Sequence, residues 1–116
     1  MSEFDATWRP TPAYVLVTVS GEVDMDTAAE LEDTLLTAAG HASRTLPLVL
    51  DLGGVGFLGS AGINAMITCH HRCSADGTSF VVAAPPRSVA RVLRITAVDT
   101  VLTVVAELPG VTVNPS

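Results

Sequence analysis

Residues 47–67, Pro-Leu-Val-Leu-Asp-Leu-Gly-Gly-Val-Gly-Phe-Leu-Gly-Ser-Ala-Gly-Ile-Asn-Ala-Met-Ile, decide the fold of this chain. An apolar run over 46–52 predicts a buried strand, and the glycines at 53, 54 and 56 predict a turn after it. Ser60 then precedes a segment with helical spacing. A helix that begins at a serine leaves its hydroxyl beside free backbone N–H groups. Ser60 is therefore either a structural cap or a site where charge is added and removed.

The segments on either side of this stretch alternate between strand and helix patterns. Strands are expected over 13–20, 46–52, 80–84 and 98–105, with a short partner strand over 4–8. Helices are expected over 27–40, from 60 to about 74, and after the proline pair at 85–86. This order predicts an α/β fold with helices packed on a mixed, mostly parallel sheet and an antiparallel edge at the N-terminal side.

Two of the predicted helices show a clear division between inward and outward faces. Thr27 and Glu30 have the spacing of a capping box, which places the start of the first helix. The inward residues of this helix are expected to be Ala28, Leu31, Leu35 and Ala38, and the outer face carries Glu30, Glu32 and Asp33 as a solvated acidic surface. In the second helix the expected inward residues are Ile63, Met66, Ile67 and His70.

The length, charge and hydropathy of the chain exclude several classes of protein. The 116 residues are enough for one domain, with a core expected over about 13–105 and a loose tail over 109–116. Six basic against twelve acidic residues give a net charge of −6, which disfavours nucleic-acid binding. No apolar stretch approaches the roughly 20 residues that cross a bilayer, and the first residues do not resemble an export signal. A cytoplasmic location without membrane insertion is expected.

Cys69 and Cys73 lie in the sequence Cys-His-His-Arg-Cys. On a helix these two thiols are one turn apart on a shared face, whereas His70 and His71 point elsewhere. The four side chains therefore do not form a zinc site, and no metal or other cofactor is expected. The cysteines are interpreted as small hydrophobic residues of a helix. A redox role for Cys69 and Cys73 is the open alternative.

Three motifs resemble those of STAS domains, in particular the bacterial anti-sigma-factor antagonists. Residues 48–63 resemble the family pattern apolar-apolar-Asp-Leu-x-x-Val-x-Phe-apolar-Asp-Ser-Ser/Thr-Gly-Leu. Upstream, 17–24 contains the family's Gly-Glu-apolar-Asp turn, and downstream, 92–99 resembles its Val-Leu-x-Leu-Thr-Gly-x-Asp stretch. The motifs occur in the family's order and together cover about 13–105, which is far more specific than any one of them.

The resemblance implies a STAS-like fold and a non-enzymatic role in transcription regulation. In this family an anti-sigma factor with serine kinase activity phosphorylates the serine that aligns with Ser60. The unphosphorylated antagonist binds this kinase and frees a sigma factor; phosphorylation breaks the complex, and a serine phosphatase restores it. The partner surface is expected to comprise Asp24, Asp26, Thr27, Gly59, Ser60, Ala61, Gly62 and Asn64.

The chain also departs from the family pattern. Gly59 replaces the usual Asp, Ala61 replaces the usual second hydroxyl residue, and residues 108–116 do not form the usual final helix. These departures keep a second role open, a STAS-like docking subunit of a transporter ATPase that is not phosphorylated. An enzyme is disfavoured, because no histidine is placed to activate Ser60 and residues 59–62 lack the Gly-x-Ser-x-Gly elbow of hydrolases.

Overall fold

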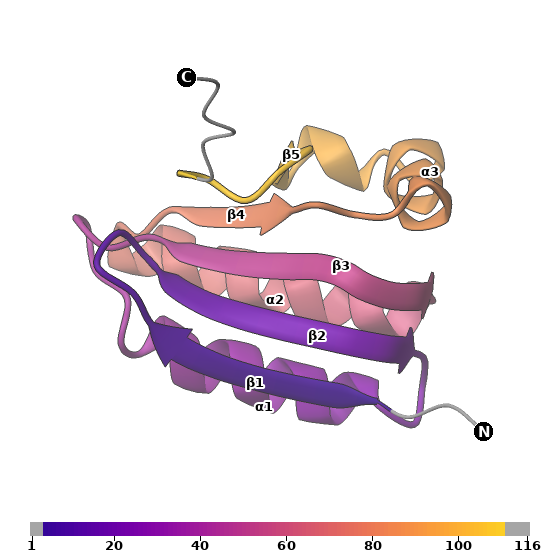
Figure 1. Ribbon diagram of the computed structural model, residues 1–116, viewed down its shortest axis with the longest axis horizontal. Coiled ribbons are helices and arrows are strands. Elements are labelled where there is room, and N and C mark those ends of the chain that lie inside the picture. Colours follow the sequence, from indigo (N-terminus) through magenta and orange to yellow (C-terminus); the bar gives the residue numbers. More distant parts are fainter. Residues whose placement is uncertain (1–3, 111–116) are drawn as a thin grey trace, which may run out of the picture.

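The structure, a computed structural model, describes residues 4–110 (Figure 1). Within them strands and helices alternate as the sequence predicts. The elements are β1 (Asp5–Pro10), β2 (Val15–Val23), α1 (Ala28–Ala39), β3 (Leu48–Leu58), α2 (Ser60–Asp76), β4 (Phe80–Ala83), α3 (Arg87–Ile95), the 3-10 turn η1 (Val98–Thr100) and β5 (Thr103–Val105).

The five strands form one sheet in the spatial order β1-β2-β3-β4-β5. Strand β1 runs antiparallel to β2, and the other neighbouring pairs are parallel. The predicted mixed sheet with an antiparallel N-terminal edge is therefore confirmed. Because β2, β3 and β4 are parallel, their carboxyl ends lie at the same end of the sheet, where each strand leads into a helix (right-hand side of Figure 1).

Helices α1 and α2 cover one face of the sheet, and the main core lies between these helices and the sheet (Figure 1). The inward residues predicted for α1 are all buried, and Leu31, Leu35 and Ala38 lie in this core together with valines of β2 (Val15, Val17 and Val19). Alternate residues of a strand point to opposite faces, so Leu16 and Val49 belong to a smaller buried cluster on the other face. The central strands are thus buried on both faces, as expected.

The glycines after residue 52 do not form the predicted turn. Strand β3 continues through them to Leu58, and its pairing with β2 is irregular around Ser20 and Gly21. A Cβ atom on Gly54 would lie 2.9 Å from the Cβ of Ser20, and Gly21 has a φ of 94°. The glycines therefore allow two bulged strands to approach closely rather than reversing the chain.

The last predicted strand is also shorter than expected. Only Thr103–Val105 pair with β4, while Val98–Thr100 form the turn η1. Ala97 precedes this turn with a φ of 60°, a left-handed backbone conformation that breaks the extended chain. From β5 to Gly110 no helix follows, and residues 111–116 of the predicted tail lie outside the described residues. In the described part of the chain, no helix is long and apolar enough to cross a membrane.

Candidate functional site

Ser60 is the first residue of α2 and is exposed to solvent. Gly59, with extended backbone angles, occupies the cap position, and its carbonyl oxygen accepts the N–H groups of Gly62 and Ile63 at 3.1 Å each. No side chain caps this helix, so the Ser60 hydroxyl is not a structural cap. The N–H groups of Ser60 and Ala61 precede the first helical hydrogen bond and have no acceptor within the helix.

The start of α2 packs closely against the end of β2. The Gly59 N–H donates to the carbonyl of Val23 at 2.9 Å. A Cβ atom on Gly62 would lie 2.4 Å from Cγ1 of Val23 and 2.8 Å from Cδ1 of Leu58. Gly62, expected to contact a partner, is instead buried. It acts as a spacing residue that sets how closely the helix approaches the sheet.

The loop between β2 and α1 lies beside Ser60 and is held by its own side chains. The hydroxyl of Thr27 donates to the Glu22 carbonyl at 2.9 Å and accepts the Asp24 N–H at 3.0 Å. The carboxylate of Asp24 accepts the N–H groups of Asp26 at 2.9 Å and Thr27 at 3.3 Å. The predicted capping box is therefore wrong, since Thr27 makes no cap hydrogen bond to the helix. Asp24 supplies the acceptor for the loop, and Asp26 remains exposed.

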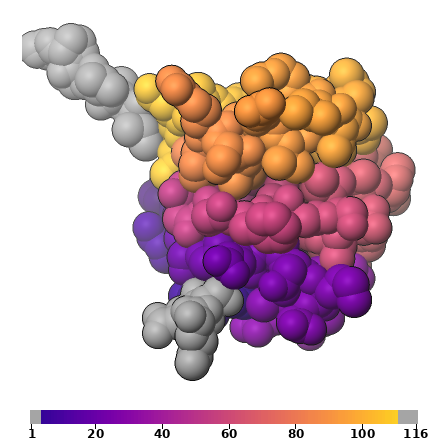
Figure 2. Space-filling view, turned by 90° about the vertical axis from the view of Figure 1, so that its right-hand side faces the viewer, coloured from indigo at the N-terminus to yellow at the C-terminus, as the bar shows by residue number. Residues whose placement is uncertain are grey.

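Two large exposed apolar side chains on the segments that adjoin the start of α2 were missed by the sequence reasoning. Met25 is 85% exposed and Phe57 is 52% exposed. Phe57 lies next to Gly59, because a Cβ atom there would be 3.2 Å from Cε2 of the ring. In Figure 2 the segments that contain them, purple near residue 25 and magenta near residue 57, lie together on one face. The sequence did contain a signal for Met25. It lies between Asp24 and Asp26, outside the predicted strands and helices, so no buried face accounts for its apolar side chain.

The charges around Ser60 are uneven. The first turn of α2 contains no acidic residue, so the partial positive charge at the N-terminus of this helix is not neutralised from within the helix. Asp24 and Asp26 follow Val23, whose carbonyl is bonded to Gly59. Asn64 is exposed one turn after Ser60, and Ala61 is half-buried. The two segments that carry the residues predicted to contact a partner, 24–27 and 59–64, are thus joined through the hydrogen bond between Gly59 and Val23, and Gly62 alone among these residues is fully buried.

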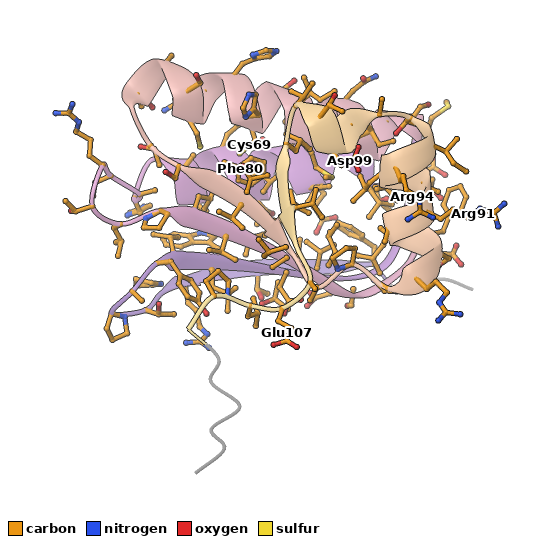
Figure 3. All side chains as sticks on the ribbon, turned by 90° about the horizontal axis from the view of Figure 1, so that it is seen from above. Cys69, Phe80, Arg91, Arg94, Asp99 and Glu107 are labelled. Carbon is orange, nitrogen blue, oxygen red and sulfur yellow. The ribbon has the colours of Figure 1, made fainter. Side chains whose placement is uncertain are left out.

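Cys69 and Cys73 lie on the inward face of α2, where they are 0% and 1% exposed. Figure 3 shows Cys69 between this helix and the sheet, close to Phe80. The hydrogen bond to Cys73 and burial raise the pKa of the Cys69 thiol above its ordinary value. His70, predicted to face inward, is only half-buried, because the two cysteines take that face. Across residues 4–110, no group of three or more His, Cys, Asp or Glu side chains could hold a metal.

This burial leads to a prediction about thiol reactivity. The thiolate is the reactive form, and both thiols are shielded from solvent, so neither is expected to react with Ellman's reagent in the folded protein at pH 8. Both are expected to react at once in guanidinium chloride. Absorbance at 412 nm measures the reaction. Rapid labelling of the folded chain would contradict this packing and would support the redox alternative.

Comparison with known proteins identifies the fold family. The family model described as "Mlab, STAS domain" matches residues 7–106. An anti-sigma factor antagonist from Mycobacterium paratuberculosis is similar in structure, with a TM-score of 0.80 and 26% identity over 91% of this chain and 88% of that protein.

Two further similar structures, each 14% identical, are alike in fold alone. The Bacillus cell fate determinant SpoIIAA in its phosphorylated form gives a TM-score of 0.62 over 88% of this chain and 90% of its own. The murine anion transporter Slc26a9 gives 0.66 over 86% of this chain, which corresponds to 19% of the transporter. The family match spans most of the chain, and the sheet order and helix positions agree with it. The chain belongs to the STAS domain family.

Proposed function

We propose that this chain is an anti-sigma-factor antagonist: unphosphorylated, it binds an anti-sigma factor, and phosphorylation of Ser60 releases it. The observation that carries the proposal is the exposed Ser60 hydroxyl, which caps no helix and follows Gly59, itself in contact with the Phe57 ring and the Val23 carbonyl. The 26% identity to the Mycobacterium antagonist supports this role. In this role the chain is a regulator: when it binds the anti-sigma factor, a sigma factor is freed.

The proposed contact area, here called the Ser60 surface, consists of Met25, Asp26, Phe57, Ser60 and Asn64. Met25 and Phe57 supply the apolar area that a partner would remove from water, and exposed apolar residues of this size are common anchors of interfaces. Asp26 and the net charge of −6 favour a partner with a basic contact surface. Thr27 and Asp24 hold the loop in the shape that presents Met25.

Phosphorylation would change the charge at the middle of this surface. The Ser60 oxygen attacks the γ-phosphorus of ATP, ADP leaves, and the hydroxyl proton passes to a base of the kinase. The phosphoserine carries about −1.5 to −2 charges and three acceptor oxygens. The free N–H groups at the start of α2 can stabilise this anion within the antagonist. A closely fitted partner would lose contact through the added bulk, the cost of desolvation and repulsion from Asp26.

Reversal requires a separate serine phosphatase. Water attacks the phosphorus, the Ser60 oxygen leaves and takes up a proton, and inorganic phosphate is released. In the antagonist Ser60 is exposed and its predecessor, Gly59, has no side chain, so both enzymes have access to the phosphoryl group. The chain is the substrate in both steps and supplies no catalytic group.

The proposal is tested by mass spectrometry of the intact protein after incubation with an anti-sigma kinase and ATP. One phosphate, about 80 Da, is expected on the wild type and none on Ser60→Ala. Ser74→Ala is the matched control, since Ser74 is an exposed serine at the other end of α2. Modification that persists in Ser60→Ala would overturn the assignment of the site.

The second candidate is the docking subunit of a transporter ATPase. It is favoured by Gly59 and Ala61, where the expected acidic and hydroxyl residues are absent, and by the Phe57 ring that lies beside Gly59. This role uses the same apolar side chains without phosphorylation. Absence of any mass increase with cognate kinases, together with a stable complex with an ATPase subunit, would favour it over the switch.

A further inference from the structure

Helix α3 carries an exposed cationic surface that the proposed switch does not use. Arg87, Arg91 and Arg94 are three of the chain's six basic residues, and all are exposed. Their spacing of four and three residues places them on one face of the helix, and Ile95, four residues after Arg91, extends that face. Figure 3 shows Arg91 projecting away from the body of the protein. These four residues are called the α3 patch.

Local stability explains Arg94, which lies in the last turn of α3 where a positive charge favours the helix dipole, but it does not explain Arg87 and Arg91. Helix α3 contains no acidic residue that could pair with these arginines. The ion pair found among residues 4–110 joins Arg72 to Asp76 of α2. Arg87 lies in the first turn, where a positive charge opposes the helix dipole, and Arg87 and Arg91 are like charges one turn apart. Residues that oppose local preferences in this way are expected at functional surfaces.

The apolar part of the surface is also open. Ile95 is 69% exposed on a helix whose opposite side, with Val89 and Leu93, is buried. On another side of the helix, Arg94 of the patch also lines a hollow of about 410 Å³, together with Ala90, Leu93, Asp99 and Val104, among others. Asp99 lines the same hollow as Arg94, whereas Arg87 and Arg91 do not line it. The surface therefore combines cationic side chains with room for an aliphatic side chain.

We propose that the α3 patch docks an acidic segment of another protein that carries an aliphatic side chain. Charge complementarity selects the segment: carboxylates pair with the guanidinium groups, which bind carboxylates in a bidentate manner. The aliphatic side chain contacts Ile95 or enters the hollow. The patch is at the same end of the sheet as Ser60, and in Figure 2 the orange segment of α3 lies beside the magenta segment. One partner could thus contact both, although this proposal does not depend on the role of Ser60.

The test uses the full chain and a fluorescein-labelled 12-residue peptide with four glutamates and two leucines, followed by anisotropy. Binding is expected to be at least tenfold weaker for Arg91→Glu and unchanged for Arg44→Glu, an exposed arginine outside the patch. It is also expected to be unchanged for Ser60→Asp, which separates this proposal from the switch. Ile95→Ser should weaken binding while leaving its salt dependence intact. Circular dichroism melting checks that each variant is folded.

Several outcomes would overturn the proposal. One is equal binding of a control peptide with glutamine in place of glutamate, because charge would then play no part. Another is equal affinity of Arg91→Glu and wild type. Tighter binding to a 12-nucleotide single-stranded DNA or to phosphatidylglycerol vesicles than to the acidic peptide would assign the patch to a different ligand. Concentration-dependent self-association that Arg91→Glu abolishes, seen by sedimentation, would assign it to a second copy of this chain.

Discussion

Replacing Ser60 with aspartate is expected to weaken binding to the anti-sigma factor by about a hundredfold or more. The substitution puts a negative charge on the Ser60 surface, which also contains the exposed apolar side chains of Met25 and Phe57. An unpaired charge that is buried on binding costs several kcal/mol, and about 2.7 kcal/mol corresponds to a hundredfold. Isothermal titration calorimetry of the purified pair measures the loss.

Two controls separate charge from shape and position. Ser60→Asn has nearly the size of the aspartate variant without its charge, and it is expected to bind much more tightly than Ser60→Asp. Ser74→Asp adds the same charge at the exposed far end of α2 and is expected to bind like the wild type. Equal affinity of Ser60→Asp and Ser60→Asn would mean that charge at this position does not decide binding.

Gly62→Val is expected to destabilise the fold by roughly 3 kcal/mol. Even the Cβ atom of a side chain there would lie 2.4 Å from Cγ1 of Val23, and the branched valine adds two further carbons. Helix α2 and strand β2 would have to separate, and this would also disturb the loop that presents Met25. Chemical denaturation followed by circular dichroism gives the free energy of unfolding.

Gly56→Ala is the matched control for Gly62→Val. A Cβ atom on Gly56 meets nothing within 4 Å, although this glycine lies in the adjoining strand β3. Its free energy of unfolding is expected to stay within about 0.5 kcal/mol of the wild type. If Gly62→Val were as stable as Gly56→Ala, the tight contact of α2 with β2 would not be what positions Ser60.

Much of the fold follows from patterns that are local in the sequence. The alternation of strand and helix patterns was enough to predict the element order and the mixed sheet, because short crossovers between parallel strands leave few topologies. The spacing of Leu31 and Leu35 predicted the buried face of α1. The position of Ser60 at the start of a helix followed from the change from an apolar run to helical spacing.

What the sequence did not predict depends on contacts between distant segments. The glycines of β3 look like turn residues in isolation, but they serve the close approach of β3 to the bulged end of β2. Ala97 has the left-handed backbone for which the family pattern uses glycine, and the turn that follows it delays the start of the expected strand to Thr103. Thr27 bonds back to Glu22 rather than to its helix. Each of these features depends on contacts or backbone angles that the spacing of apolar residues does not reveal.

The segments that carry the predicted site residues lie side by side in the structure, and their role as a partner surface stays a prediction. The loop at Asp24 and the start of α2 meet because the Gly59 N–H donates to the Val23 carbonyl. Gly62 was included although packing buries it, and Met25 and Phe57 were left out. An interface search that starts from apolar residues without an inward position would have found both.

The central claim is tested most directly by one sample measured twice. The affinity of the purified chain for its anti-sigma factor is determined by calorimetry before and after complete phosphorylation of Ser60. The account predicts tight binding before phosphorylation and at least a hundredfold weaker binding afterwards, restored by a serine phosphatase. Equal affinity of the two forms would contradict it.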